Sequence, residues 1–298
     1  MAPPIALLGP TASGKSALAL AVARARAGVE LVSVDSMQVY RGMDVGTAKP
    51  TPAERAEVPH HLLDLVEPTE EFTVAEFQRA ARAALTDIDA RGARALLVGG
   101  TGLHLRAVVD DLDIPGRWPE LRADLEAEAE RDGAPALHAR LAELDPVAAG
   151  RMEPGNARRV VRALEVTLGS GRPFSSFGPG LTDHAQREVV QVGLDVEPAA
   201  LATRIEARVD AMLAAGFVDE VRALGPLGRT AGQALGYQEL LAHLAGETSL
   251  DEARDRIVVR TRQFARRQRA WFRRDPRIRW VAPDDAYDLL LRLVDPPE

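Results

Sequence analysis

The chain has 298 residues, a formal net charge of −7 at pH 7 and no cysteine. This composition excludes disulfides, thiolate metal sites and cysteine nucleophiles, while the length suffices for one large domain or two smaller ones. The N-terminus lacks the basic region of a signal peptide and no apolar run approaches the ~18 residues of a membrane span, so we expect a cytoplasmic protein without membrane contact.

The first third of the chain alternates short apolar runs with amphipathic segments. Apolar runs predict strands, and spacings of three and four predict helices. We predict strands over 5–8, 30–34 and 94–98, and helices over 15–27 and 74–91. Such alternation is typical of a parallel sheet with helices on both faces, in which ligands bind at the carboxyl ends of the strands.

The pattern changes after the Ile-Pro-Gly segment at 114–116, where strand candidates cease. We predict helices over 119–131, 135–144 and 156–168, and the next strand over 189–194. From 198 onwards the chain is predicted to be mostly helical. We therefore expect two parts: a core built from 1–113 and 189–298, and a helical insert over 114–188.

The loop after the first predicted strand fits the P-loop pattern G-x-x-x-x-G-K-[ST] in full. It consists of Gly9, Pro10, Thr11, Ala12, Ser13, Gly14, Lys15 and Ser16. Glycines let backbone N–H groups surround a phosphate chain, the lysine supplies a positive charge, and Ser16 is a candidate Mg²⁺ ligand. The loop predicts diphosphate or nucleotide binding, including ATP, without specifying the reaction.

Two further polar groups follow predicted strand ends. Asp35 follows the second strand and is a candidate base or water-mediated Mg²⁺ ligand, although a turn-capping aspartate would look the same. Thr101 lies in the Gly99–Gly102 turn and is either a substrate donor or a helix N-cap. No strand ends in an evident Walker-B aspartate, which weakens an ATPase interpretation.

Histidines and arginines complete the candidates. His60 and His61 are adjacent and lack partner ligands, so we favour a structural role over a metal site. Eleven arginines lie between 254 and 279; the stripe among them either lines a polyanion or is solvated. It comprises Arg262, Arg266, Arg269 and Arg273. In the insert, one helix face carries Arg158, Arg159 and Arg162, which either contact phosphates or pair with acids such as Glu165.

Together these motifs resemble the tRNA dimethylallyltransferases, also called tRNA isopentenyltransferases. The resemblance extends over nearly the whole chain. Its blocks are GPTASGKS (9–16), DSMQVYRGMDVGTAKP (35–50), VPHHLLD (58–64), VGGTGLHL (98–105), ARRVVRALEV (157–166), QALGYQEL (233–240) and TRQFARRQRAWFR (261–273). The second and last blocks are long and specific, and a generic P-loop kinase has neither.

The resemblance implies a P-loop NTPase-like parallel sheet with a mobile, tRNA-binding helical insert. It implies transfer of a dimethylallyl group from dimethylallyl diphosphate to the exocyclic amino nitrogen of the adenosine 3′ of the tRNA anticodon, with Mg²⁺ assisting and pyrophosphate leaving. The P-loop would hold the donor diphosphate. Asp35 would accept the proton of the amine, and Thr101 would orient the substrate.

The resemblance also implies contacts with the anticodon stem-loop. The residues carried over are Asp35, Ser36, Met37, Gln38, Thr101, Arg122, Arg158, Arg159, Val160, Val161 and Arg162. Two segments depart from the family pattern: 146–156 is Gly-rich where a polar run is usual, and Arg266 or Arg267 replaces a usual lysine. We expect the chain to act as a monomer.

Three other functions use part of these features. A nucleotide isopentenyltransferase would share the P-loop and Asp35 but would need no extended basic surface. A P-loop kinase would transfer phosphate from ATP to a small acceptor. A non-catalytic RNA-binding protein would bind tRNA without modifying it. The arginine-bearing helices favour tRNA as the acceptor.

Overall fold

The computed structural model describes residues 3–178 and 189–295. The chain divides into two compact units. The first consists of Met1–Asp110 and Gln186–Glu298, and the second of Asp111–Ala185, against the expected insert of 114–188. The final stretch of that expected insert, 179–188, lies outside the described residues.

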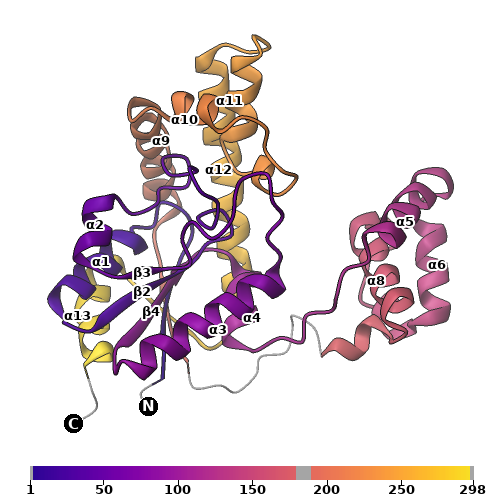
Figure 1. Cartoon of the computed structure of the whole chain (residues 1–298), viewed down its shortest axis with the longest axis horizontal. Helices are drawn as coiled ribbons and strands as arrows, with labels where there is room; N and C mark the ends of the chain where they lie inside the picture. Colours follow the sequence, from indigo (N-terminus) through magenta and orange to yellow (C-terminus); the bar gives the residue numbers. More distant parts are fainter. Residues whose placement is uncertain (1–2, 179–188, 296–298) are drawn as a thin grey trace. The chain divides into compact units, whose positions relative to one another are not determined.

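The first unit contains a six-stranded parallel sheet with the order β3-β2-β4-β1-β5-β6 (Figure 1). Its strands are β1 (Ile5–Leu8), β2 (Val29–Val34), β3 (His60–His61), β4 (Arg94–Gly99), β5 (Val190–Leu194) and β6 (Ile278–Val281). Every pair is parallel, and Leu8, Gly99 and Val34 lie in register at the carboxyl ends of three adjacent strands. The predicted P-loop NTPase-like sheet flanked by helices is confirmed.

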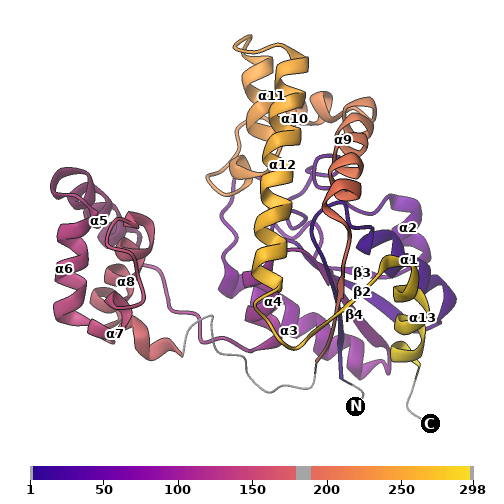
Figure 2. The ribbon, with the colours of Figure 1, turned by 180° about the vertical axis from the view of Figure 1, so that it is seen from behind.

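Helices cover both faces of this sheet because side chains alternate between the faces. Ile5 and Leu7 of β1 pack with α1 (Lys15–Ala25) and α13 (Pro283–Val294), while Ala6 and Leu8 belong to the core on the other face. Both views show the long α12 on the face opposite α1 and α13 (Figures 1 and 2). The face that carries Ala6 and Leu8 is covered by four helices: α3 (Val74–Ala90), α4 (Gly102–Val109), α9 (Pro198–Ala214) and α12 (Leu250–Phe272).

Three shorter helices complete the first unit: α2 (Pro52–Glu57), α10 (Phe217–Leu224) and α11 (Tyr237–Leu244). The long α12 begins at a capping box, in which Ser249 and Glu252 satisfy each other's backbone amides. Its apolar stripe, which includes Ile257 and Phe272, joins the core. No helix within the described ranges has the length and apolar character required to cross a membrane.

The second unit is helical in its described part. Its helices are α5 (Pro119–Asp132), α6 (Ala134–Leu144), α7 (Pro146–Ala149) and α8 (Ala157–Ser170). Its own core contains Leu125, Leu141 and Leu164, which are almost fully buried. A unit with its own apolar core is an independent packing unit.

The sequence analysis missed the strands β3 and β6 and the short helices α2 and α7, and it raised α4 only as the alternative in which Thr101 is a helix N-cap. β3 has two residues and α7 has four, so neither has a periodic pattern long enough to recognise. β6 lies at the sheet edge and its Arg279 is exposed; apart from this four-residue strand, the segment after 198 is mostly helical, as predicted. Short edge strands with charged residues are common because they discourage pairing with other chains.

Candidate active site

The candidate site lies at the carboxyl ends of three neighbouring strands. β1 leads into the P-loop, β4 into the turn with Thr101, and β2 into Asp35. Because β2, β4 and β1 are adjacent, their loops share one edge of the sheet. The structure thus brings together the predicted diphosphate loop and both predicted catalytic residues.

The P-loop connects β1 directly to the N-terminus of α1. Gly14 is the N-cap of α1 and has φ 93°, a left-handed conformation that glycine adopts without strain. Gly9 packs closely on the loop, since a Cβ there would lie 2.7 Å from Ser13 Oγ. A loop of this shape at a helix N-terminus is an anion site, because both backbone amides and the helix dipole favour negative charge.

Lys15 is the cation of this loop and is partly buried. Burial and, to a smaller extent, the charge of Arg208 lower its pKa to about 8, while Asp35 opposes the shift. Its Nζ donates a hydrogen bond to the Pro10 carbonyl at 3.3 Å. Lys15 is therefore charged at pH 7 but desolvated, so that a diphosphate would find a poorly compensated positive charge.

Two arginines of α9 also face the P-loop, and the sequence analysis did not identify them. Arg204 Nη1 donates to the Ser13 carbonyl at 3.4 Å. Burial lowers the pKa of Arg208, while the charge of Asp35 opposes that shift. Their spacing of i, i+4 places them on one helix face. The sequence around them does not indicate that this face contacts the P-loop, since Arg204 and Ser13 are 191 residues apart.

Asp35 is partly buried and lies within the electrostatic range of Lys15, Arg208 and His104. Its Oδ1 accepts the Met37 amide at 2.8 Å, which is the turn-capping bond considered from sequence. A carboxylate has two oxygens, so this bond leaves acceptor capacity for a substrate amine. Turn capping and a catalytic role are therefore compatible.

Thr101 occupies the N-cap position of α4, yet its side chain makes no capping hydrogen bond to the described backbone. The turn is tightly packed, because a Cβ on Gly99 would lie 2.2 Å from the Val34 carbonyl oxygen. The structural explanation of Thr101 as a capping residue is therefore weakened, and its hydroxyl is available to a ligand.

His104, on the first turn of α4, is a further candidate that the sequence analysis did not identify. Its Nδ1 is buried and has no hydrogen-bond partner among the described residues. The ring packs edge-on against Phe77, with 4.8 Å between the centroids. Burial lowers its pKa to about 4, and Asp35 opposes that shift, so the imidazole is neutral at pH 7.

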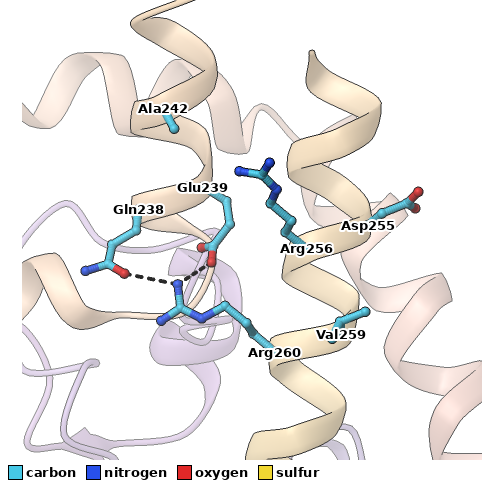
Figure 3. Close-up of a pocket in the computed structure, with 7 residues that line it drawn as sticks. All are labelled: Gln238, Glu239, Ala242, Asp255, Arg256, Val259 and Arg260. Atoms are coloured by element: carbon cyan, nitrogen blue, oxygen red, sulfur yellow. Dashed lines mark hydrogen bonds and ion pairs between the residues drawn. The ribbon is translucent and has the colours of Figure 1, made fainter. Parts of the chain in front are cut away.

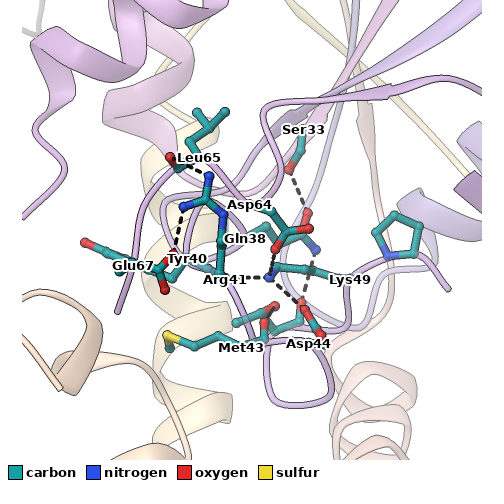
Figure 4. Close-up of polar contacts among 12 residues, drawn as sticks. Ser33, Gln38, Tyr40, Arg41, Met43, Asp44, Lys49, Asp64, Leu65 and Glu67 are labelled. Atoms are coloured by element: carbon teal, nitrogen blue, oxygen red, sulfur yellow. Dashed lines mark hydrogen bonds and ion pairs between the residues drawn. The ribbon is translucent and has the colours of Figure 1, made fainter. Parts of the chain in front are cut away.

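The segment after Asp35 is held in place by hydrogen bonds to Lys49, whose side chain is 1% exposed. Lys49 Nζ donates to the Tyr40 carbonyl at 2.5 Å, to Asp44 Oδ1 at 2.8 Å and to Asp64 Oδ1 at 2.6 Å (Figure 4). Arg55 holds the other oxygen of Asp64 at 2.6 Å. A buried cation that is paired with two carboxylates and a carbonyl in this way fixes a loop that has little regular structure.

The predicted RNA-contacting residues of this segment differ in their surroundings. Ser36 and Met37 are half-buried beside Asp35. Gln38 has its amide engaged internally: it accepts from Ser33 Oγ at 2.7 Å and donates to the carbonyls of Thr47 and Ala48. Gln38 thus shapes the segment through its side chain, in addition to any contact with a substrate.

In the second unit, the buried Glu165 organises the predicted RNA-contacting arginines. Its carboxylate lies 3.0 Å from Arg162 Nη1 and 3.5 Å from Arg122 Nη1. Arg158 and Arg159 are exposed. Val160 and Val161 are correctly placed on the helix, but their side chains are buried in the core of the unit, so the expected RNA contact by these side chains needs correction.

The C-terminal arginine stripe is largely paired with acids of the same unit. Arg262 pairs with Glu206, while Arg269 and Arg273 bind Asp195 at 3.1 and 2.7 Å. Arg266 is exposed. Most arginines of the stripe therefore form ion pairs that join α12 to neighbouring elements, and they do not form an unpaired basic surface for a polyanion.

Two other features lie outside the site. His61 pairs with Glu30 at 2.6 Å, and no group of three or more His, Asp or Glu suited to a metal occurs within the described ranges, in keeping with the structural interpretation of the histidine pair. A pocket of about 530 Å³ lies between α11 and α12 (Figure 3). Arg260 bridges its walls to Gln238 and Glu239, and no predicted catalytic or diphosphate-binding residue lines it.

Comparisons with known proteins give one consistent result. The family model described as IPP transferase matches residues 38–275. The tRNA dimethylallyltransferase of Kineococcus radiotolerans is 54% identical over 306 residues, covering 98% of this chain and 96% of that protein. That of Streptomyces coelicolor is 54% identical over 282 residues, covering 93% of this chain and 89% of that protein.

Two solved structures are similar along almost the full chain. The tRNA isopentenylpyrophosphate transferase of Bacillus halodurans has a TM-score of 0.70 and 38% identity, covering 99% of this chain and 96% of its own. A eukaryotic dimethylallyltransferase acting on tRNA has a TM-score of 0.79 and 26% identity, covering 97% of this chain and 76% of its own.

Proposed function

The chain belongs to the IPP transferase family, and we propose that its site transfers a dimethylallyl group from dimethylallyl diphosphate to tRNA. The chain is thus a prenyltransferase that acts on tRNA. The acceptor is the exocyclic amino nitrogen of the adenosine 3′ of the anticodon. The observation that carries this proposal is the convergence of the P-loop, Asp35 and Thr101 at one edge of the sheet.

In the reaction two bonds break, allylic C–O and amine N–H, and two form, C–N and the O–H on Asp35. The C–O bond between the allylic carbon and the diphosphate breaks, and its electron pair leaves with pyrophosphate. The lone pair of the amino nitrogen forms the new C–N bond, and Asp35 accepts the proton that the nitrogen loses. Lys15, Arg208 and the loop amides stabilise the charge that grows on the leaving group.

Alignment matters as much as charge, because an adenine amine is a poor nucleophile. Thr101 has a hydroxyl that is not used as a helix cap and would orient the acceptor. An anticodon-loop base is already partly unstacked, so placing it beside Asp35 costs only a few kcal/mol. Ser36 and Met37 would then line its approach.

The residues present fit Mg²⁺ of the kind bound chiefly through substrate phosphates. Ser16 is exposed at the start of α1, and Asp35 retains acceptor capacity. The described residues offer no all-protein metal cage, and Mg²⁺ usually needs none because it retains waters and phosphate oxygens. When bound, the ion would neutralise the leaving diphosphate.

Arginines of the second unit would bind the RNA backbone. Arg158 and Arg159 are exposed for phosphate contact, whereas Arg122 and Arg162 are oriented by Glu165. Phosphate contacts set the position of an RNA without reading its sequence. The choice of adenosine would then rest with the site around Asp35.

The test is nucleoside analysis of tRNA after incubation with the protein, dimethylallyl diphosphate and Mg²⁺. We expect N6-dimethylallyladenosine at the position 3′ of the anticodon and an equal amount of pyrophosphate. Parallel reactions contain free AMP as the acceptor, or γ-labelled ATP as the donor. Modification of AMP alone, or label transfer from ATP, would contradict the proposal.

A further inference from the structure

Gln268 of α12 connects two loops of the site through a single side-chain amide. The Thr11 N–H donates to Gln268 Oε1 at 2.8 Å, and Gln268 Nε2 donates to the Gly100 carbonyl at 2.9 Å. Thr11 belongs to the P-loop and Gly100 to the turn that carries Thr101. Gln268 itself is only 8% exposed.

The backbone of the turn is shaped to admit this amide. A Cβ on Gly100 would lie 2.4 Å from Gln268 Nε2 and 3.2 Å from the Gly9 carbonyl oxygen. The amide nitrogen, the P-loop and the turn are therefore in mutual contact. A side chain at position 100 would push one of the three away.

The same helix supports the turn at a second point. A Cβ on Gly102 would lie 2.1 Å from Trp271 Nε1, so the indole fills the space beside that residue. Gln268 and Trp271 are three residues apart and share a face of α12. The helix thus determines where both loops lie.

A buried glutamine that merely fills the core would be replaceable by an apolar side chain of similar volume. Gln268 differs, because it satisfies one donor and one acceptor that belong to different loops of the site. The planar amide thereby sets the separation between the loop proposed to hold the diphosphate and the turn proposed to orient the acceptor.

We propose that Gln268 is a positioning residue that keeps the P-loop and the Thr101 turn in the geometry required for dimethylallyl transfer. This inference rests on the proposed function. Gln268 engages the Thr11 N–H itself, so it acts through the loops. Since a displacement of about 1 Å can cost about 100-fold in rate, loss of the amide should reduce kcat and leave tRNA affinity intact.

The experiment compares three variants of the full chain. Gln268→Met keeps the volume and removes both hydrogen bonds. Gln268→Glu keeps the oxygen that accepts from Thr11 but sets a carboxylate against the Gly100 carbonyl. Gln263→Met is the matched control, because Gln263 is exposed on the same helix. We measure kcat, tRNA Kd, pyrophosphate Kd and thermal unfolding.

For Gln268→Met we expect kcat to fall about 10- to 100-fold, tRNA Kd to stay within about twofold, and pyrophosphate to bind more weakly. For Gln268→Glu, the ratio of its kcat to that of the wild type should rise as the pH falls, because a protonated carboxyl again donates to Gly100. A purely structural role would not produce this pH-dependent ratio.

Wild-type kcat in Gln268→Met, or a pH-independent ratio in Gln268→Glu, would overturn the inference. If Gln268→Met unfolds, the folded Gln268→Glu variant decides through that ratio. A wild-type protein that modifies no tRNA would instead refute the proposed function. The pyrophosphate Kd of Gln268→Met would then still report whether the amide positions the P-loop.

Discussion

At the scale of single residues, the site concentrates charge that the protein itself does not balance. Lys15 and Arg208 are partly buried cations beside one carboxylate, Asp35, and burial lowers the pKa of both cations. Keeping them charged opposes folding, since charged groups lose hydration in the interior. A diphosphate would supply the missing negative charge. Its binding would relieve the unfavourable electrostatic energy of the two cations, and this relief would strengthen donor binding.

The ionisation of Lys15 predicts how donor binding depends on pH. The pKa of Lys15 is about 8, so its charge is present below that pH and lost above it. Pyrophosphate affinity should therefore fall above about pH 8, approaching tenfold per pH unit. Calorimetric titration from pH 7 to 9.5 measures this fall.

Lys15→Arg provides the control, because a guanidinium retains its charge over this range. Comparing the two proteins at each pH also cancels the ionisation of pyrophosphate itself. The ratio of their affinities should change above about pH 8. A constant ratio would show that Lys15 does not titrate as the structure indicates.

At the scale of elements, the loop after β2 is held by one of its own side chains and by one from a distant helix. Lys49 donates hydrogen bonds to Tyr40, Asp44 and Asp64. Glu220 of α10 accepts hydrogen bonds from the backbone amides of Asp44, Val45 and Gly46 at 2.5–3.0 Å. The loop is thus restrained on both sides. Gln38, three residues after Asp35, is joined to this loop through the carbonyls of Thr47 and Ala48.

Lys49→Met should destabilise the protein strongly. The substitution leaves the Tyr40 carbonyl without its buried donor and removes a cation from Asp44, whose side chain is 56% exposed, and from Asp64, which keeps Arg55, so we expect a loss of about 2–3 kcal/mol. Urea denaturation followed by circular dichroism measures the loss in the free energy of unfolding. Arg41→Met serves as the control in the same loop, since the Arg41–Glu67 pair is about half-exposed and should contribute at most about 1 kcal/mol. Equal losses in both variants would contradict the role assigned to Lys49.

Helix α8 separates its arginines into two sets. Arg162 is tied to the buried Glu165, whereas Arg158 and Arg159 are exposed. If the exposed pair contacts RNA phosphates, Arg158→Gln and Arg159→Gln should each weaken tRNA binding and reduce the salt slope of log Kd by about 1. Filter binding at several salt concentrations measures both effects. Arg140→Gln removes a charge from α6 of the same unit and should change neither; an equal effect there would point to nonspecific electrostatics.

At the scale of the whole molecule, the sequence predicted the features that arise from local pattern. The P-loop, the strand ends at Asp35 and Thr101, and the three longer helices of the second unit, α5, α6 and α8, follow from periodicity and motif. Contacts made across long stretches of chain did not follow. Gln268 meets Thr11 across 257 residues and Arg204 meets Ser13 across 191, so only the folded topology brings them together.

The expectation of a monomer is tested on the intact chain. Large exposed apolar side chains in the described part are spread over several elements, among them Leu103 of α4, Leu168 of α8 and Leu241 of α11. Scattered apolar residues do not form a stable interface. Sedimentation should give the mass of one chain, 32.1 kDa, at micromolar concentration. A concentration-independent dimer would contradict this expectation.

The central claim is that Asp35 accepts the proton of the tRNA amine beside a diphosphate held by the P-loop. Single-turnover transfer of the dimethylallyl group by Asp35→Asn, measured beside its tRNA Kd, tests this most directly. The control is Asp251→Asn, because Asp251 is exposed on the first turn of α12. We predict that Asp35→Asn loses at least about 100-fold in transfer rate, as expected for a general base, with tRNA Kd within about twofold of the wild type. A transfer rate near that of the wild type would contradict the account.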